Sequence, residues 1–239
     1  MTEPTAHENR LGQPIGPPLP DWTPRPRPPH TEMRGRICRL EPLDAERHAR
    51  ALYEAYAEDA DGRNWTYLPY GPFASADEYA SFVRLGSRGD DTLFYAIVLE
   101  RSQRPVGVAS YLRIEPAMGT IEVGHLSYAP ALQRSTAATE AMYLMMRRVF
   151  DELGYRRYEW KCDSLNAPSR RAAERLGFRY EGTFRQMMVI KQRSRDSGWY
   201  SILDSEWPSL RAAFEHWLAP ANFDASGAQR ARLEELRGT

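Results

Sequence analysis

The most regular hydrophobic pattern along the chain lies between residues 132 and 154. Apolar side chains recur there at steps of three and four residues: Met142, Met145, Met146, Val149, Phe150 and Leu153. This spacing places them on one face of an α-helix. Gly154 follows directly, and glycine is typical of a helix end. The pattern predicts a helix whose methionine-rich face packs into the core.

Four other stretches predict helices, at residues 44–58, 75–86, 166–178 and 207–218. Asp44 favours the N-cap position of the first. Ser75, with Glu78 three residues later, forms a capping box at the start of the second. Gly177 falls at the C-terminal cap position of the third.

Runs rich in apolar and β-branched residues predict the strands, at 34–43, 92–100, 105–114, 119–130, 155–163, 178–191 and 198–207. The order is β-α-α-β-β-β-α-β-α-β-β. Antiparallel strands come first and a β-α-β-α-β run follows, so we expect one α+β domain with a mixed, mostly antiparallel central sheet flanked by helices. A dinucleotide-binding fold would need repeated βαβ units and a glycine-rich first turn, and the sequence has neither.

The domain is expected to span residues 34–220, between two different end segments. Half of the 18 prolines fall in the first thirty residues, which excludes helix and central strand there and predicts an extended, proline-rich arm over residues 1–33. This arm is either disordered or docked, through Trp22 and Leu19, on the domain or on a second subunit of a homodimer. Residues 221–239 are expected to form a polar, peripheral C-terminal tail.

Composition and charge narrow the class of partner. The formal net charge is +0, which argues against a wide nucleic-acid footprint. No apolar run approaches the length of a membrane span, and the N-terminus lacks the apolar core of a signal peptide. Cys38 and Cys162 lie far apart, which suggests two reduced thiols in a cytoplasmic protein. The five histidines are scattered and predict no metal site.

The chemistry-bearing stretch precedes the methionine-rich helix. It supplies a cation, hydroxyls and small side chains in six consecutive positions: Arg134, Ser135, Thr136, Ala137, Ala138 and Thr139. A helix N-terminus carries unpaired N–H groups and a partial positive charge, so this stretch suits an anion such as a pyrophosphate. Simple capping by Ser135 or Thr136, without a ligand, is the alternative that these residues leave open.

Here the chain resembles the GNAT superfamily of acetyl-CoA-dependent N-acetyltransferases, and within it the branch of the ribosomal-protein N-terminal acetyltransferases. The resemblance covers roughly residues 34–218. Residues 134–139 occupy the family's pyrophosphate-binding pattern Arg/Gln-x-x-Gly-x-Gly/Ala, with Ala137 and Thr139 in place of glycines. Because alanine adopts positive φ poorly, this departure bears on the conformation of the loop.

A second motif, NAPSRRAAERLGF, resembles the family's Asn-x-x-Ser…Gly-Phe segment. The resemblance implies that Asn166 bonds the pantetheine arm of acetyl-CoA and that Ser169 lies near the reacting thioester. A helix N-cap and a first-turn residue are the alternatives when each is taken alone. The resemblance further implies that the backbone of Leu126 to Tyr128 binds the pantetheine and the acetyl carbonyl.

Acetyl transfer to an amine needs a base, because an ammonium is not a nucleophile, and benefits from an acid for the leaving thiolate. Glu122 is the only carboxylate in TIEVGHLSY, and strict alternation places it on the face of Gly124 and Leu126. It is therefore our candidate base; an ion-paired or solvent-facing strand residue is the alternative. The same alternation turns His125 to the opposite face, where a structural role is expected.

Ser169 is the candidate acid. Many members of the superfamily carry a tyrosine seven residues after the asparagine, where this chain has Ala173. A carboxylate that the ribosomal-protein branch can carry on the next strand is replaced by Met188. These departures leave Ser169 as the acid and Glu122 as the only named base.

The acceptor is expected to meet the loop NWTYLPYGPF. Trp65, Tyr67 and Tyr70 either form an aromatic wall there or pack under the loop. Asp196 and Trp199, in the turn and strand of the last hairpin, face the same side. Asp196 could receive a cationic amine, or it could simply form the turn, as Asp often does in hairpins. A protein N-terminus and a small-molecule amine both remain open as acceptors. A catalytically silent coenzyme A-binding module and a dimeric structural protein are the competing functions.

Overall fold

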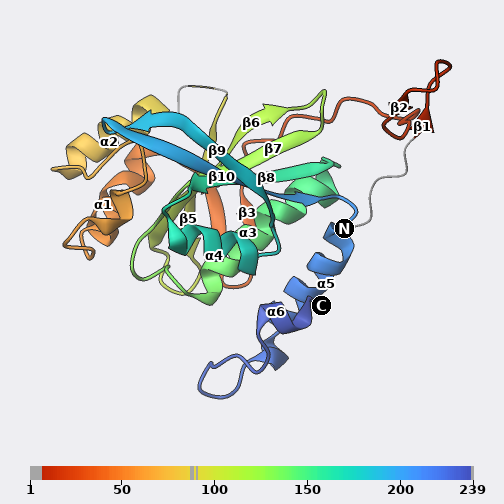
Figure 1. Cartoon of the computed structure of the whole chain (residues 1–239). Coiled ribbons are helices and arrows are strands. Elements are labelled where there is room, and N and C mark those ends of the chain that lie inside the picture. Colours follow the sequence, from red (N-terminus) through yellow and green to blue (C-terminus); the bar gives the residue numbers. More distant parts are fainter. Residues whose placement is uncertain (1–6, 87–88, 90, 238–239) are drawn as a thin grey trace.

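The protein is described by a computed structural model, in which residues 7–86, 89 and 91–237 are placed. Its centre is an eight-stranded sheet in the order β3-β4-β5-β6-β7-β8-β10-β9 (Figure 1). The strands are β3 Met33–Arg34, β4 Cys38–Pro42, β5 Leu93–Leu99, β6 Pro105–Glu115, β7 Thr120–Tyr128, β8 Arg157–Asp163, β9 Arg179–Ile190 and β10 Arg193–Leu203. All neighbouring pairs are antiparallel except β7 and β8, which are parallel. The predicted mixed, mostly antiparallel sheet is confirmed.

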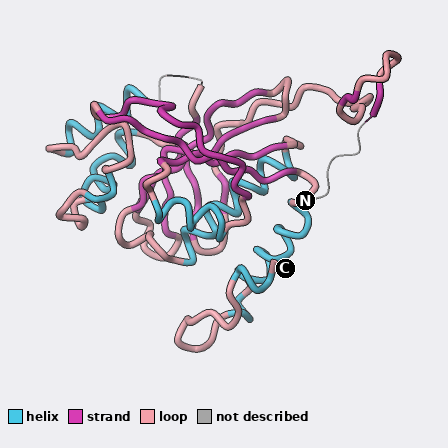
Figure 2. The backbone as a smooth tube through the Cα atoms, in the orientation of Figure 1, coloured by secondary structure: helices cyan, strands magenta, loops and turns pink. Residues whose placement is uncertain are grey.

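Helices cover both faces of this sheet (Figure 2). They are α1 Arg50–Tyr56, α2 Ala76–Gly86, α3 Thr136–Arg147, α4 Ala167–Arg175, α5 Trp207–Leu218 and α6 Leu233–Leu236, with short turns η1 Ala45–Ala49, η2 Arg63–Trp65, η3 Arg148–Glu152 and η4 Pro220–Asn222. One core cluster joins the sheet to α3, α4 and α5, and a second joins it to α1 and α2.

The methionine-rich helix is α3, continued by η3 to Glu152. Met142, Met145 and Met146 are at most 1% exposed, as the periodicity predicts. Because this face is buried against the sheet, the N-terminus of α3 is held at a fixed place beside the end of β7.

The last hairpin differs from the prediction in its turn. β10 begins at Arg193, five residues before the predicted start at residue 198. The turn is made by Lys191 and Gln192, with φ of 47° and 60°. Turns with positive φ at both central residues usually contain Asn or Gly, and this sequence has neither at residues 191 and 192. Asp196 therefore lies within β10, whereas the sequence predicts it in the turn.

The N-terminal arm docks on its own domain. Trp22 Nε1 donates to the Ala117 carbonyl at 2.9 Å, Tyr95 donates its hydroxyl to the Pro29 carbonyl at 3.1 Å, and Arg148 Nη1 donates to the Thr31 carbonyl at 2.7 Å. Before this docked part, β1 His7–Glu8 and β2 Pro14–Ile15 form a small hairpin that stands away from the body (Figure 1). This hairpin was not predicted from the sequence.

The C-terminal segment is mostly exposed, as expected of a polar tail, but two of its residues, Asn222 and Leu233, are buried. Leu233 in α6 is fully buried. Asn222 donates through Nδ2 to the Trp217 carbonyl at 3.0 Å, which ties the segment to the end of α5. Within residues 7–86, 89 and 91–237, no helix is long and apolar enough to cross a membrane.

Candidate active site

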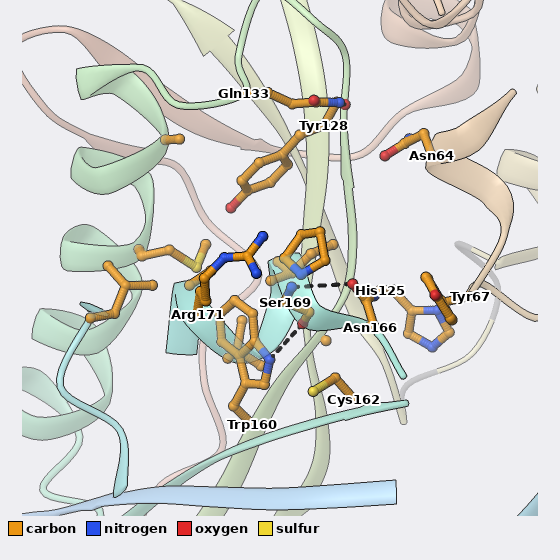
Figure 3. Close-up of a pocket in the computed structure, with 18 of the residues that line it drawn as sticks. Asn64, Tyr67, His125, Tyr128, Gln133, Trp160, Cys162, Asn166, Ser169 and Arg171 are labelled. Atoms are coloured by element: carbon orange, nitrogen blue, oxygen red, sulfur yellow. Dashed lines mark hydrogen bonds between the residues drawn. The ribbon is translucent and has the colours of Figure 1, made fainter. Parts of the chain in front are cut away.

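The sheet opens between its two parallel strands. Pairing of β7 with β8 ends at Val123 and Trp160, although β7 continues to Tyr128 and β8 to Asp163. Beyond Val123, β7 therefore has no strand partner on the β8 side. A cavity of about 1460 Å³ occupies this opening, and α3, α4, η2, β9 and β10 all contribute to its lining (Figure 3).

The N-terminus of α3 lies at one side of the cavity. Ser135 is the N-cap, and its Oγ accepts from the Ala138 N–H at 3.1 Å. The N–H groups of Thr136 and Ala137, in the first turn, have no carbonyl four residues back within the helix. Capping by Ser135, one of the two alternatives, is thus present, and it leaves N–H groups of the first turn for an anion.

The glycine-free loop needs no glycine conformation at Ala137 or Thr139. Both lie inside α3, and the residue with positive φ in this stretch is Arg134, at 57°. Ala137 and Thr139 are each 3% exposed. Thr139 accepts through Oγ1 from Arg175 Nη1 at 3.0 Å, so its larger side chain is fixed in place.

Asn166 and Ser169 meet at the start of α4 (Figure 3). Asn166 is the N-cap and accepts through Oδ1 from the Ser169 N–H at 3.1 Å. Trp160 Nε1 donates to Ser169 Oγ at 3.0 Å. An indole nitrogen only donates, so the hydroxyl proton of Ser169 remains for another acceptor. The neighbouring Cys162 thiol has its pKa raised, chiefly by burial, while the Ser169 hydroxyl acts in the opposite direction.

Glu122 lines the cavity but is ion-paired. Its side chain is 4% exposed. Arg113 Nη1 lies 2.8 Å from both of its oxygens, and Lys161 Nζ lies 2.8 Å from Oε2. Lys161 also pairs with Glu159 at 2.8 Å. The ion-paired alternative therefore describes the geometry of Glu122 in this structure.

The expected alternation along β7 fails at His125. The register with β6 shifts in this part of β7, and His125 has φ of 51°. A bulge of this kind turns a side chain to the other face of a sheet. His125 consequently lines the cavity, as do Glu122, Gly124 and Leu126, and Leu126 also packs against the core cluster that contains α3.

The imidazole of His125 is held by aromatic neighbours. It stacks on Tyr70 with ring centroids 5.6 Å apart, and the Tyr70 hydroxyl lies 3.1 Å from Nδ1. Phe94 approaches to 5.1 Å. Burial, and secondarily the charge of Arg113, lowers the pKa of His125 to about 4. The ring is therefore neutral at neutral pH, since protonation would require charging a largely dry group.

Only one of the three loop aromatics faces the cavity. Tyr67 lines it, and its hydroxyl donates to the Leu165 carbonyl at 3.2 Å. Trp65 is 5% exposed and packs under the loop against Tyr56 and Phe73. Tyr70 stacks on His125 and does not line the cavity. The aromatic wall on the acceptor side thus reduces to Tyr67 and, from β10, Trp199.

Asp196 does not face an incoming amine. Its Oδ1 accepts from the Gln186 N–H on β9 at 2.7 Å, at a bulge between Arg195 and Ser197. Trp199 does line the cavity, with Lys161 Nζ 3.6 Å from the centre of its ring.

Two arginines of α4 line the cavity but were not predicted as site residues from the sequence. Arg171 and Arg175 line the cavity together with Arg134 from the loop before α3. Their i, i+4 spacing places both on one face of α4, so a helical projection of this segment could have found them. Three cations beside a helix N-terminus fit the phosphates of a coenzyme A thioester. Of the residues described, no group of three or more His, Cys, Asp or Glu side chains is placed to hold a metal ion.

A sheet that opens between two parallel strands, with a helix N-terminus and arginines at the opening, defines an acyltransferase that takes its acyl group from coenzyme A. The family model "Acetyltransferase (GNAT) domain" matches residues 38–179, more than half of the chain, and the chain belongs to this family. It is accordingly an acetyl-CoA-dependent acetyltransferase.

Three relatives illustrate the similarity. The crystal structure of a GCN5-related N-acetyltransferase from Brucella melitensis has a TM-score of 0.90 and 49% identity, over 92% of this chain and 100% of that one. The uncharacterized N-acetyltransferase YnaD of Bacillus subtilis is 28% identical over 66% of this chain and 89% of its own length. The ribosomal-protein-serine acetyltransferase of Escherichia coli is 25% identical over 68% of this chain and 91% of its own.

Proposed function

We propose that the enzyme transfers the acetyl group of acetyl-CoA to a primary amine, on a protein N-terminus or a small molecule. The observation that carries the proposal is the cavity that lies in the opening between β7 and β8. It joins the N-terminus of α3 to the wall made by η2, β9 and β10, so donor and acceptor can enter from different sides and meet in the sheet. The name of the E. coli relative favours a protein acceptor. Cys38 and Cys162 are free thiols, which favours a cytoplasmic location for the enzyme.

The cofactor side follows from the contacts around α3 and α4. We assign the pyrophosphate to the first turn of α3 and its flanking residues, Arg134, Ser135, Thr136, Ala137, Ala138 and Thr139, with Arg171 adding charge. All of them except the buried Ala137 line the cavity. Asn166 would bond the pantetheine arm. The backbone of Leu126 to Tyr128, which lacks a strand partner towards β8, would bind the pantetheine and the acetyl carbonyl.

For the chemistry, the amine nitrogen bonds to the acetyl carbon while the carbon–sulfur bond breaks. Ser169 would give its proton to the leaving thiolate, since Trp160 orients the hydroxyl as a donor. Glu122 would take one proton of the incoming ammonium, and the second proton of the nitrogen would return to Ser169, which leaves the amide, the free thiol and a neutral serine. Because Lys161 is 10% exposed and Arg113 51% exposed, we propose that Arg113 is the partner that moves aside when the ammonium arrives.

The test is release of free coenzyme A thiol on a panel of amines: peptides, amino acids, polyamines and amino sugars. A parallel thermal shift with acetyl-CoA reports binding, because stabilisation grows with ligand concentration over Kd. Turnover of at least one amine is expected. A thermal shift without turnover of any amine would leave a silent coenzyme A-binding module, and no shift at saturating acetyl-CoA would contradict both functions.

A further inference from the structure

One wall of the cavity is a row of hydrogen-bond donors without acceptors. Arg195, Ser197 and Trp199 on β10 all line the cavity. Arg195 Nε, Ser197 Oγ and Trp199 Nε1 are covered from solvent, and none has a hydrogen-bond partner among the residues that the structure describes. Ser197 is 3% exposed. The guanidinium and indole nitrogens can only donate, and the described residues supply no acceptor to them.

The carboxylates of the cavity have partners other than Arg195. Asp59 accepts from the Asn64 N–H at 2.9 Å, Asp163 accepts from the Leu165 N–H at 2.9 Å, and Glu122 is paired with two cations. Asp196, which neighbours Arg195 in sequence, is bound to the backbone of β9. Among the described residues, Arg195 forms no ion pair with any of these carboxylates.

Arg195 also lies on the acceptor side and close to the reacting end. It pairs with Met188 on β9, and Met187, Met188 and Ile190 line the cavity beside it. Its charge acts on Cys162, which neighbours Ser169. The phosphates of the donor are provided for elsewhere, by the arginines around α3 and α4. The phosphates of the donor therefore do not account for Arg195, whose charge can serve an anionic group of the acceptor.

We infer that the acceptor amine carries an acidic oxygen group, a carboxylate or its equivalent, which Arg195, Ser197 and Trp199 bind while the amine faces the opening between β7 and β8. This inference rests on the proposed N-acetyltransferase function. The same chemistry is offered by a free amino acid and by a peptide with an acidic residue near its N-terminus. Both present a carboxylate at a short distance from an amine.

The test compares matched pairs of amines in the thiol-release assay. One arm pairs amino acids with their carboxamides, and the other pairs short peptides whose second residue is Asp or Asn. In the arm that contains the natural class, the acidic member should show kcat/KM at least about tenfold higher, as expected for a charge-assisted hydrogen bond. Arg195→Ala should abolish this preference by raising KM for the acidic member only, and Arg195→Lys should restore part of it.

Arg193→Ala is the matched control, because Arg193 lies on the same strand, is exposed and does not line the cavity. It should keep the preference, and a thermal shift with acetyl-CoA checks that every variant is folded. Turnover of neutral or cationic amines without preference for the acidic members would overturn the inference and leave the N-acetyltransferase function standing. If no amine is turned over, the proposed function fails, and calorimetry of the protein with coenzyme A and the same pairs still decides: equal affinity within each pair overturns the inference.

Discussion

The indole Nε1 of Trp160 donates to the Oγ of Ser169 at 3.0 Å, from a strand at the opening of the sheet to the first turn of α4. This contact fixes the serine oxygen as an acceptor and leaves its proton free to be donated. Asn166 caps the same turn. The capping and catalytic interpretations of this motif are therefore compatible, since the cap uses the backbone of Ser169 and leaves its side chain available.

Ser169→Ala should lower kcat by about 10- to 100-fold, because the leaving thiolate loses its proton donor. The thermal shift produced by acetyl-CoA should stay the same. Trp160→Phe is the control. It keeps the Ser169 hydroxyl, removes only the hydrogen bond that orients it, and should lower kcat by a few-fold. A Ser169→Ala enzyme with the kcat of the wild type would exclude Ser169 as the acid.

Glu122→Gln should lower kcat by about 100-fold, because the amide cannot take the proton of the amine. Affinity for acetyl-CoA should change little. Glu159→Gln is the matched control, since Glu159 shares Lys161 with Glu122 but does not line the cavity. Equal losses in the two variants would show that the ion-pair network, and not proton transfer, sets the rate.

Ala137→Gly tests whether glycine at this position, as in the family pattern, would improve the binding of acetyl-CoA. Ala137 is helical and buried, so glycine should leave the Kd for acetyl-CoA within about twofold and lower the free energy of unfolding by up to about 1 kcal/mol. Calorimetry and urea unfolding measure the two quantities. A large gain in affinity would mean that backbone freedom at this position limits binding.

Stability should depend on pH through His125. Its pKa is lowered from 6.5 to about 4 in the folded protein, so between these values the unfolded chain binds more protons than the folded one. The free energy of unfolding should thus fall as pH drops through this window, by about 2 kcal/mol at pH 4.5. Urea unfolding at pH 7 and pH 4.5 should show that extra loss in the wild type and not in His125→Gln. His7→Gln, on the exposed β1 strand, should behave as the wild type.

Much of the fold could be predicted because its causes are local. The spacing of Met142, Met145 and Met146 defines a buried helix face whatever it packs against, and the hairpin of β5 and β6 follows from two apolar runs with a polar link. The turn at Lys191 and Gln192 was not predicted, because its positive φ values are imposed by the pairing of β9 with β10 and not by turn-forming residues.

The candidate site divides in the same way. The sequence by itself determined which residues stand at helix starts, so Ser135 and Asn166 appear as caps beside the opening, as their residue types favour. Alternation could not place His125, because a bulge depends on the register with a neighbouring strand that is remote in sequence. Only the tertiary structure decided that Glu122 is held by Arg113 and Lys161 and that Arg195 forms no ion pair among the described residues. Both depend on which charges distant strands bring together, and no local pattern encodes that.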